Sequence, residues 1–506
     1  MNRPVPNLHH LPYPRSLRRQ VIARAVRTFS AVAVFGAMLA LGNGCTPKGT
    51  DSGSAAPLTS SAPLTQPQRD ANLASFDLVW KLVRDRHYDS KLNGVDWVAV
   101  RDELRPKVES ATSTDQVRAL IGDMISRLGQ SHMAVLPSEA YAADELAAEQ
   151  ASAAPAAGNA TSSSNAPASK SAAPTAPSQE QGSVGIDVRV FNNRAFVTDV
   201  TPGSPAALAG VKPGWEVVSV GRYSIRRNLA RQSTASTPSV GMPVTALQAL
   251  RLRALVGGSV GETRHIGFLN DNDKAEIRSL VAVAPSGMPF KFGQLPTEYV
   301  DLRSELLPGN IGYISTNIWL DPARTMRFVA ASVTEFSGAR GMIIDLRGNP
   351  GGLGAMASGM GGFFVTQPDQ VLGEMKMRSG NQRFLLTPRK PSFNGPVAIL
   401  IDELSASTSE IFAGGMRDIG RARVFGARSA GAALPSVIEL LPNGDRFQYV
   451  FANYTSASGK VLEGNGVEPD EVVAFDRRAL LAGKDPVVDK ARNWILAQSP
   501  AVTRLP

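Results

Sequence analysis

Cysteine is almost absent from this chain of 506 residues, which holds Cys45 alone. A single cysteine excludes an internal disulfide and any zinc site that is built on cysteines. Histidine is also scarce, with five residues, and the sequence shows no carboxylate–histidine cluster, so we expect no metal and no other cofactor. Charged residues make up 19% and hydrophobic residues 43%, which is the composition of an ordinary globular protein.

The positive charge of the chain is concentrated at its N-terminus. Of the formal charge of +9, residues 1–44 contribute six arginines and no acid, which leaves +3 for the rest. So weak a field gives no support for a nucleic-acid partner. These arginines precede an apolar run, residues 29–42, which is too short for a comfortable transmembrane helix and fits the apolar region of an export signal.

Cys45 follows small residues directly after this apolar run. The arrangement resembles the lipidation site of a bacterial lipoprotein, although Leu41 stands four residues before the cysteine and Gly42 stands where the pattern has its leucine. A soluble export signal and an uncleaved anchor remain alternatives. Each version predicts an extracytoplasmic protein of the bacterial cell envelope or periplasm, and lipidation would attach it to the membrane.

Composition and periodicity divide the chain into segments. Residues 151–180 contain 22 Ala, Ser or Pro, a composition that cannot bury enough apolar surface to offset its chain entropy. Apolar residues recur at helical spacing before this segment, and strands alternate with helices after residue 290, which is the α/β signature. The predicted segments are an export signal (1–44), a disordered tether (45–67), a helical cap domain (68–138), a disordered linker (139–182), two ordered blocks (183–285 and 286–476) and a helical tail (477–506).

The block 183–285 carries two kinds of turn motif. Ser183, Val184, Gly185 and Ile186 form a loop before a strand, and its glycine turn frees backbone N–H groups for a carboxylate. Gly-Ser-Pro-Ala at 203–206 and Pro-Gly at 213–214 follow. Together they resemble a bacterial PDZ domain, with 246–256 as the helix beside the peptide groove. The resemblance implies that a peptide binds as an added strand, often by its C-terminus; a PDZ domain that only positions its neighbour remains the alternative.

Two stretches of the block 286–476 carry chemistry. Residues 343–352, Ile-Ile-Asp-Leu-Arg-Gly-Asn-Pro-Gly-Gly, predict a buried strand and a glycine turn that opens a helix. Backbone N–H groups at such a helix N-terminus suit a developing oxyanion, and no Gly-Lys-Ser/Thr follows that would indicate a P-loop. Residues 405–413 place a serine cluster between a strand and a helix, the setting that exposes a nucleophile, although helix capping alone would explain one serine.

These two stretches resemble the tail-specific, or C-terminal processing, serine protease family, and the resemblance extends over about 76–138 and 183–476. It implies a twisted α/β core of the crotonase/Clp-protease type with an inserted PDZ domain and an N-terminal helical domain. It further implies that 286–476 is a serine peptidase core. The implied catalytic groups are Ser407 as nucleophile and the N–H groups of Thr408 and of Gly351 or Gly352 as oxyanion donors.

The lysine base of the processing proteases is missing, because Ala432 stands at its position. A serine still needs a base, and histidine is the natural candidate at neutral pH. Ser131 and His132 resemble the Ser-His pair of the tricorn-like branch of the family, in which the histidine is the base. That branch has a glutamate in Glu-x-x-Gly-Val-x-Pro-Asp, which residues 463–470 match. The resemblance implies that Glu463 orients His132 and that Ser131 helps to position it; Glu468 and then Glu439 are the other candidates for the acid.

The sequence thus predicts an exported serine endopeptidase that hydrolyses peptide bonds in polypeptide tails or unfolded proteins. In this hypothesis the helical cap must dock on the core, because otherwise Ser407 has no base. The alternative is a catalytically inactive, membrane-tethered PDZ binding scaffold, which the missing lysine keeps open. Turnover retained in His132→Ala would instead indicate a lysine base such as Lys460.

Overall fold

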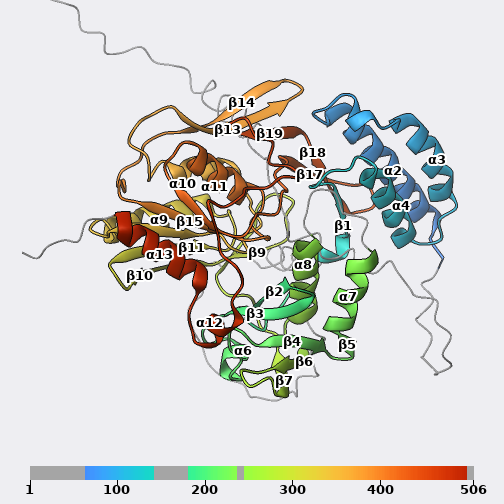
Figure 1. The fold of residues 1–506 in the computed structure, drawn as a ribbon. Helices are drawn as coiled ribbons and strands as arrows, with labels where there is room; N and C mark the ends of the chain where they lie inside the picture. Colours follow the sequence, from blue (N-terminus) through green and yellow to red (C-terminus); the bar gives the residue numbers. More distant parts are fainter. Residues whose placement is uncertain (1–62, 142–180, 236–243, 499–506) are drawn as a thin grey trace, which may run out of the picture.

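The structure is a computed structural model that describes residues 63–141, 181–235 and 244–498. The predicted export signal and Cys45 lie outside the described residues, as do nearly all of the predicted tether and most of the predicted linker. Within the described part of the chain, no helix is both long enough and apolar enough to cross a membrane. Figure 1 shows three regions, with the N-terminal helices, the block 183–285 and the C-terminal block in successive colours.

The N-terminal region is a small helical domain. Its helices are α2 (Gln66–Arg86), α3 (Trp97–Glu109) and α4 (Thr114–Ser126), with a short 3-10 turn η2 (Leu92–Gly94) between the first two. Asp96 and Ser113 start α3 and α4 by accepting backbone N–H groups with their side chains. The helix α2 begins two residues inside the predicted tether, because Gln68 accepts the backbone N–H of Thr65 and closes the first turn.

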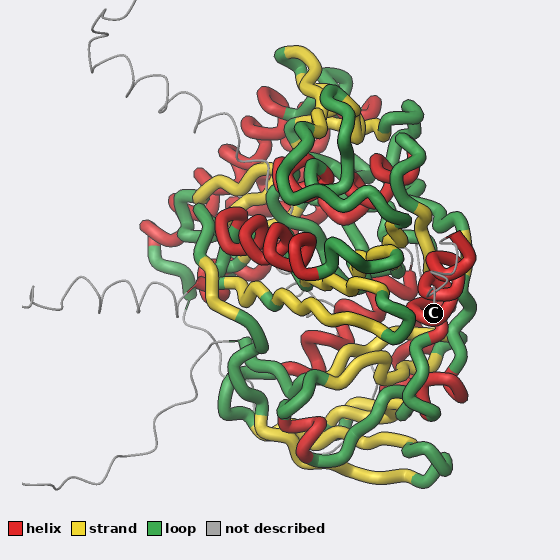
Figure 2. The backbone as a smooth tube through the Cα atoms, turned by 90° about the vertical axis from the view of Figure 1, so that its left-hand side faces the viewer, coloured by secondary structure: helices red, strands yellow, loops and turns green. Residues whose placement is uncertain are grey.

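The block 183–285 is built on an antiparallel sheet in the order β2-β3-β4-β6-β7, with β5 paired to β4. The strand β2 is therefore at the edge of the sheet, and the helix α8 packs against it. Figure 2 shows these strands gathered below the rest of the molecule. The elements are β2 (Ile186–Phe191), β3 (Arg194–Val200), α6 (Pro205–Leu208), β4 (Glu216–Val220), β5 (Tyr223–Ser224), α7 (Ile225–Ala235), α8 (Val244–Gly257), β6 (Thr263–Leu269) and β7 (Ala275–Val281).

A second six-stranded sheet forms the centre of the C-terminal block, in the order β10-β11-β12-β15-β16-β20. Only the β10–β11 pair is antiparallel. The strands β12 and β15 are buried along their whole length, as parallel strands covered on both faces must be. The strands are β10 (Leu302–Leu307), β11 (Ile311–Thr316), β12 (Gly341–Asp345), β15 (Val397–Ile401), β16 (Arg423–Gly426) and β20 (Glu471–Val472).

Helices cover both faces of this sheet. One face packs against α9 (Pro322–Glu335), α10 (Ala355–Gly361) and α11 (Thr408–Asp418), and the other packs against α13 (Pro486–Gln498). The predicted α/β fold class is confirmed. The remaining elements are η3 (Ser138–Tyr141), the β8 (Met288–Phe290) and β9 (Glu298–Val300) pair, α12 (Arg477–Leu481), and two three-stranded sheets described next.

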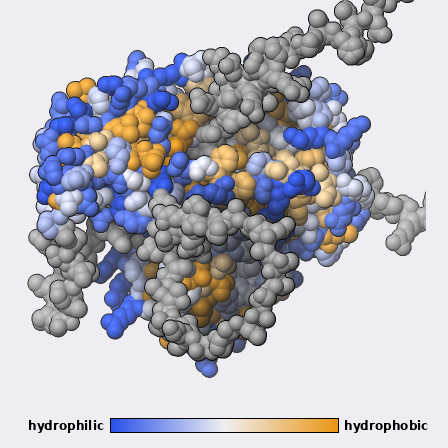
Figure 3. Space-filling model, turned by 180° about the vertical axis from the view of Figure 1, so that it is seen from behind, coloured by the Kyte–Doolittle hydropathy of each residue, from blue (hydrophilic) through white to orange (hydrophobic). Residues whose placement is uncertain are grey.

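The two small sheets extend the core toward the helical domain. One has the order β14-β13-β19, and the other has the order β1-β18-β17. The second sheet joins distant parts of the chain, because β1 follows α4 while β17 and β18 belong to the C-terminal block. The strands are β1 (Ala134–Leu136), β13 (Gln370–Met377), β14 (Gly380–Leu386), β17 (Ser436–Leu440), β18 (Arg446–Val450) and β19 (Ala452–Ser456). On the face seen in Figure 3, hydrophobic side chains form several separate areas among hydrophilic ones.

Candidate active site

Ser407 lies at the N-terminus of α11, at the end of the loop that follows β15. Its backbone has φ 53° and ψ −113°, a conformation that is sparsely populated for a residue with a side chain. Its N–H donates to the carbonyl oxygen of Ala432 (2.8 Å) and to the carboxylate of Glu410 (3.0 Å). The serine side chain itself makes no capping hydrogen bond. A serine held in a strained turn between a strand and a helix has the backbone geometry of a nucleophile elbow, although the Ser407 side chain is buried here.

Glu410 holds this turn from inside the protein, and the sequence analysis did not single it out. Its side chain is fully buried and accepts the hydroxyl of Ser429 (2.5 Å) and the N–H groups of Gly431 (2.8 Å), Ala432 (3.0 Å) and Ser407. Burial raises the pKa of Glu410 to about 7, although these four hydrogen bonds favour the ionised form. The Ser-x-x-Glu spacing of a capping box was the signal for this contact.

The glycine turn lies directly beside Ser407. A Cβ atom on Gly351 would lie 2.7 Å from the Cβ of Ser407 and 3.0 Å from the nitrogen of Thr408. The N–H of Gly351 donates to the side chain of Asn349 (2.9 Å), whereas the N–H groups of Gly352 and Thr408 find no acceptor among the described residues. Of the two glycines, Gly352 is therefore the one whose N–H is available to an oxyanion, together with Thr408 at the start of α11.

His132 occupies the turn between α4 and β1, with φ 58° and a buried side chain. The hydroxyl of Ser131 lies 2.7 Å from its Nδ1 and donates to Oε2 of Glu463 (2.9 Å), while the Ser131 N–H donates to Oε1 (2.8 Å). Glu463 thus reaches the imidazole through Ser131 and not by direct contact. Because the Ser131 proton points to Glu463, Nδ1–H donates to Ser131 and the lone pair stays on Nε2.

Burial shifts the pKa values of both His132 and Glu463. It lowers the pKa of His132 to about 3, so the imidazole is neutral at neutral pH with an unprotonated nitrogen, and burial makes it a weaker base than an ordinary histidine. Burial raises the pKa of Glu463, and its hydrogen bonds from Ser131 and from the N–H of Ala433 oppose that rise.

One loop contacts both the serine turn and the histidine group. Ala432 accepts the N–H of Ser407, and the next residue, Ala433, donates its N–H to Glu463 (3.1 Å). Ser407 and Glu463 are therefore bonded to consecutive residues. The position that carries lysine in the processing proteases lies within this loop, with the buried side chain of Ala432.

Besides the shared hydrophobic cluster and the Ser131–Glu463 bonds, two contacts help to dock the helical domain on the core and so to fix where His132 lies. The strand β1 pairs antiparallel with β18, with Ala134 opposite Gln448. Arg118 of α4 forms two hydrogen bonds with the fully buried carboxylate of Asp445, of 2.9 and 2.7 Å. Both contacts join residues that are more than 300 positions apart in the sequence.

The other candidates lie elsewhere. Glu468 is exposed and 3.7 Å from Arg428, and Glu439 is exposed and accepts the hydroxyl of Tyr449. Lys460 is exposed. His87 is buried and lies 2.6 Å from the side chain of Gln130, which precedes Ser131, so it supports the turn that carries His132.

The predicted peptide loop precedes the edge strand β2. Ser183 pairs with Val283 through two backbone hydrogen bonds, and Val184 is buried. The N–H of Gly185 donates to the hydroxyl of Ser183 (3.0 Å), so this N–H is already occupied. Ile186 starts β2 and faces Val200 of β3. The PDZ assignment stays a prediction.

Comparison with known families identifies two parts of the chain. Residues 310–473 match peptidase family S41, and residues 70–126 match the tricorn protease C1 domain. The first match contains Ser407, the glycine turn and Glu463, and the second covers most of the helical domain that precedes His132.

Individual proteins agree with these matches. A probable CtpA-like serine protease of Staphylococcus haemolyticus is 25% identical over 295 residues, 58% of this chain and 52% of that protein, so the chain spans about half the length of this relative. The carboxyl-terminal-processing protease of Picosynechococcus sp. is 22% identical over 432 residues, 84% of this chain and 89% of that protein. The crystal structure of mature CPAF is similar with a TM-score of 0.55 at 13% identity, covering 86% of this chain and 99% of that chain, which shows a shared fold. The predicted family is confirmed: the chain contains a peptidase family S41 domain and a tricorn protease C1 domain, has C-terminal processing proteases as homologues, and has the features of a serine peptidase.

Proposed function

We propose that the protein is an exported serine endopeptidase that hydrolyses peptide bonds in polypeptide tails or unfolded chains. The observation that supports this most directly is the convergence of two groups on the loop 432–433. One is Ser407 in its strained turn beside the Gly351–Gly352 pair, and the other is the hydrogen-bonded series His132, Ser131 and Glu463.

In this mechanism the Ser407 hydroxyl attacks the scissile carbonyl carbon while Nε2 of His132 takes its proton. The N–H groups of Gly352 and Thr408 stabilise the oxyanion of the tetrahedral intermediate. His132 then returns the proton to the leaving amine, which releases the first product and leaves an acyl ester on Ser407. A water molecule, deprotonated by His132, hydrolyses the ester.

Glu463 acts on His132 through Ser131. When the imidazole becomes charged, Nδ1–H donates to a hydroxyl that is itself bonded to a carboxylate, and this polarised series stabilises the imidazolium. A neutral imidazole in the resting enzyme is ready to accept a proton. The low pKa of about 3 belongs to the resting state without substrate, in which burial opposes the charged form.

The edge strand β2 supports a role of the block 183–285 in substrate delivery. An edge strand with a neighbouring helix can accept a peptide as an added strand, and the loop 183–186 stands at the start of β2. Export and lipid attachment at Cys45 are proposed from the sequence of residues 1–45 alone. Under this proposal the protein acts in the cell envelope on polypeptide partners, held at the membrane by a lipid anchor.

A fluorophosphonate probe tests the activity, because it reacts with activated serines. We expect the purified chain to be labelled, mass spectrometry to place the label on Ser407, and Ser407→Ala to abolish it. His132→Ala should lower turnover of an unfolded protein substrate by on the order of 10³-fold. The matched control is His265→Ala, which changes a histidine on β6 that contacts Ser279. A folded protein without labelling or turnover would favour the binding scaffold.

A further inference from the structure

A buried carboxylate, Asp402, joins the two loops that flank Ser407. It follows β15 directly, and its Oδ1 accepts the N–H of Gly348 (2.8 Å) at the start of the glycine turn. The same oxygen accepts the N–H groups of Leu404 (3.0 Å) and Ser405 (3.1 Å), in the loop that leads to Ser407. One carboxylate oxygen therefore ties the glycine turn to the nucleophile loop.

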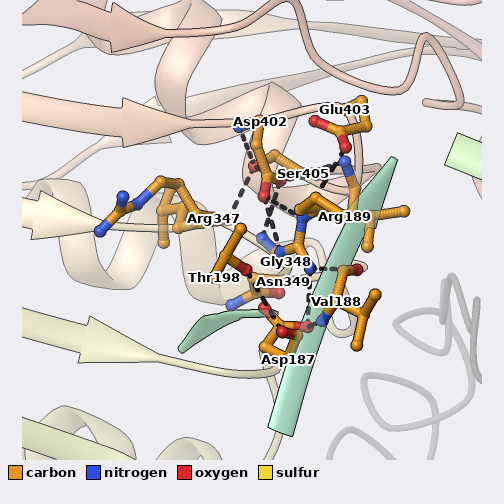
Figure 4. A network of polar contacts seen from close by, with 12 residues as sticks. Asp187, Val188, Arg189, Thr198, Arg347, Gly348, Asn349, Asp402, Glu403 and Ser405 are labelled. Atoms are coloured by element: carbon orange, nitrogen blue, oxygen red, sulfur yellow. Dashed lines mark hydrogen bonds and ion pairs between the residues drawn. The ribbon is translucent and has the colours of Figure 1, made fainter. Parts of the chain in front are cut away.

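The other oxygen is held by the block 183–285. Oδ2 of Asp402 accepts Nε of Arg189 (2.7 Å), a buried residue in the edge strand β2. Arg189 also donates to Asp187 (2.6 Å), which accepts Nε of Arg253 from α8 (2.9 Å). Arg253 donates in turn to the carbonyl oxygen of Gly348 (3.2 Å). Figure 4 shows the side chains of Asp187, Arg189, Asp402 and Glu403 around the backbone of Gly348.

The glycine turn is buried, but on one side it borders a cavity. Gly348 and Pro350 line a cavity of about 520 Å³ between the block 183–285 and the carboxyl ends of β11, β12 and β15, and Arg189 and Asp402 line the same cavity. A group that faces a cavity lacks contact atoms there, so its position depends on its polar contacts. Charge-assisted hydrogen bonds to a carboxylate are about twice as strong as neutral ones.

We propose that Asp402 is a positioning residue for the candidate active site and that Arg189 holds it in place from the neighbouring block. The proposal rests on the proposed function, because it concerns the same Ser407 site. Gly352 and Thr408, the two oxyanion donors, lie in the two segments that Asp402 joins. Oxyanion donors act only within about 2.7–3.1 Å of the oxygen, so a small displacement of either segment lowers transition-state stabilisation without abolishing substrate binding.

Glu403 provides a matched control in the same cluster. It is buried and lies 3.9 Å from Nε of Arg189, and burial together with the nearby charge of Asp402 raises the pKa of Glu403 to about 7. Among the described contacts it accepts no hydrogen bond from the turn 348–352. Glu403→Gln therefore tests the loss of a nearby carboxyl group that does not link the loops, whereas Asp402→Asn tests the loss of the charged link between them.

The experiment measures kcat and KM on a peptide substrate for the full-length chain, with thermal unfolding of each variant. We expect Asp402→Asn to lower kcat by on the order of 10²-fold or more, the scale of losing one oxyanion donor, with KM changed less than about threefold. Glu403→Gln should keep kcat within about threefold. Arg189→Met should also lower kcat, and Arg189→Lys, which restores the charge, should recover part of the loss.

The losses in the double variant Arg189→Met/Asp402→Asn should be smaller than the product of the two single losses, because both act on one contact. An unchanged kcat in Asp402→Asn, or an equal loss in Glu403→Gln, would overturn the positioning role. If Asp402→Asn does not fold, the comparison of Arg189→Lys with Arg189→Met decides, and no difference between these two rejects the proposal. Wild-type protein that is neither active nor labelled by a fluorophosphonate rejects the proposed function instead.

Discussion

Replacing Arg118 by methionine should separate the helical domain from the core while each part stays folded. Arg118 of α4 forms an ion pair with Asp445, and the side chain of Asp445 is fully buried. Its other donors are the N–H of Ser138 (2.9 Å) and the amide of Asn443 (3.0 Å), both neutral. Methionine keeps the apolar stem of arginine and removes the charge.

The expected magnitude follows from the burial of this pair. Removing one partner of a buried ion pair costs about 3–5 kcal/mol, because the other charge stays buried without compensation. Since Arg118 and Asp445 belong to different parts of the chain, this cost falls on docking and lowers the docked population. A loss of 1.4 kcal/mol is a factor of ten in that equilibrium, so docking then depends on the strand pair β1–β18 and on the hydrophobic cluster that α2–α4 share with β18.

Hydrogen exchange provides the assay. In Arg118→Met, the amides of α4 and β1 should exchange faster than in the wild type, while those of β12 and β15 in the core sheet keep their protection. Fluorophosphonate labelling of Ser407 should fall in the same variant, because His132 moves with the helical domain. Asp445→Asn combined with Arg118→Met should recover much of the protection, since no charge stays buried. Equal loss of protection in the core sheet, or an unchanged rate in α4, would refute this reasoning.

Three further predictions concern the site itself. Burial lowers the pKa of His132 to about 3, below its ordinary 6.5, so between these pH values the folded protein binds fewer protons than the unfolded chain. The free energy of unfolding should therefore fall by up to roughly 5 kcal/mol as the pH decreases from 6.5 to 3. Urea unfolding of His132→Gln should lack this part of the pH dependence, and the same pH dependence in the variant and the wild type would contradict the prediction. Ser131→Ala removes the bridge between His132 and Glu463 and should lower kcat by about 10–10²-fold with little change in KM. A loss equal to that of His132→Ala would show that Ser131 does more than transmit the effect of Glu463. Gly351→Ala places a Cβ 2.7 Å from that of Ser407 and should abolish fluorophosphonate labelling, whereas Gly380→Ala, with a similar positive φ of 128° and nothing within 4 Å, should label like the wild type.

The sequence alone determined the local elements that carry the chemistry. The apolar residues 342–344, followed by Asp-Leu-Arg and then Gly-Asn-Pro-Gly-Gly, predict a buried strand and a turn, because apolar runs need burial on both faces and glycine permits positive φ. The family motifs around Ser407, His132 and Glu463 were also visible, since each is a short run of residues with a local backbone requirement. Glu410 was visible in principle as the last residue of a Ser-x-x-Glu capping box.

How these pieces meet follows from long-range packing and could not be predicted from the sequence. The bonds from Ser131 to Glu463 and from Arg189 to Asp402 join residues 332 and 213 positions apart, and no local pattern specifies such pairs. The side chain of Asn349 accepts the N–H of Gly351 and leaves that of Gly352 available, and the sequence does not show which way this side chain points. Local propensity acts over a few residues, whereas these contacts follow from the packing of whole domains, so the chain must fold before its site exists.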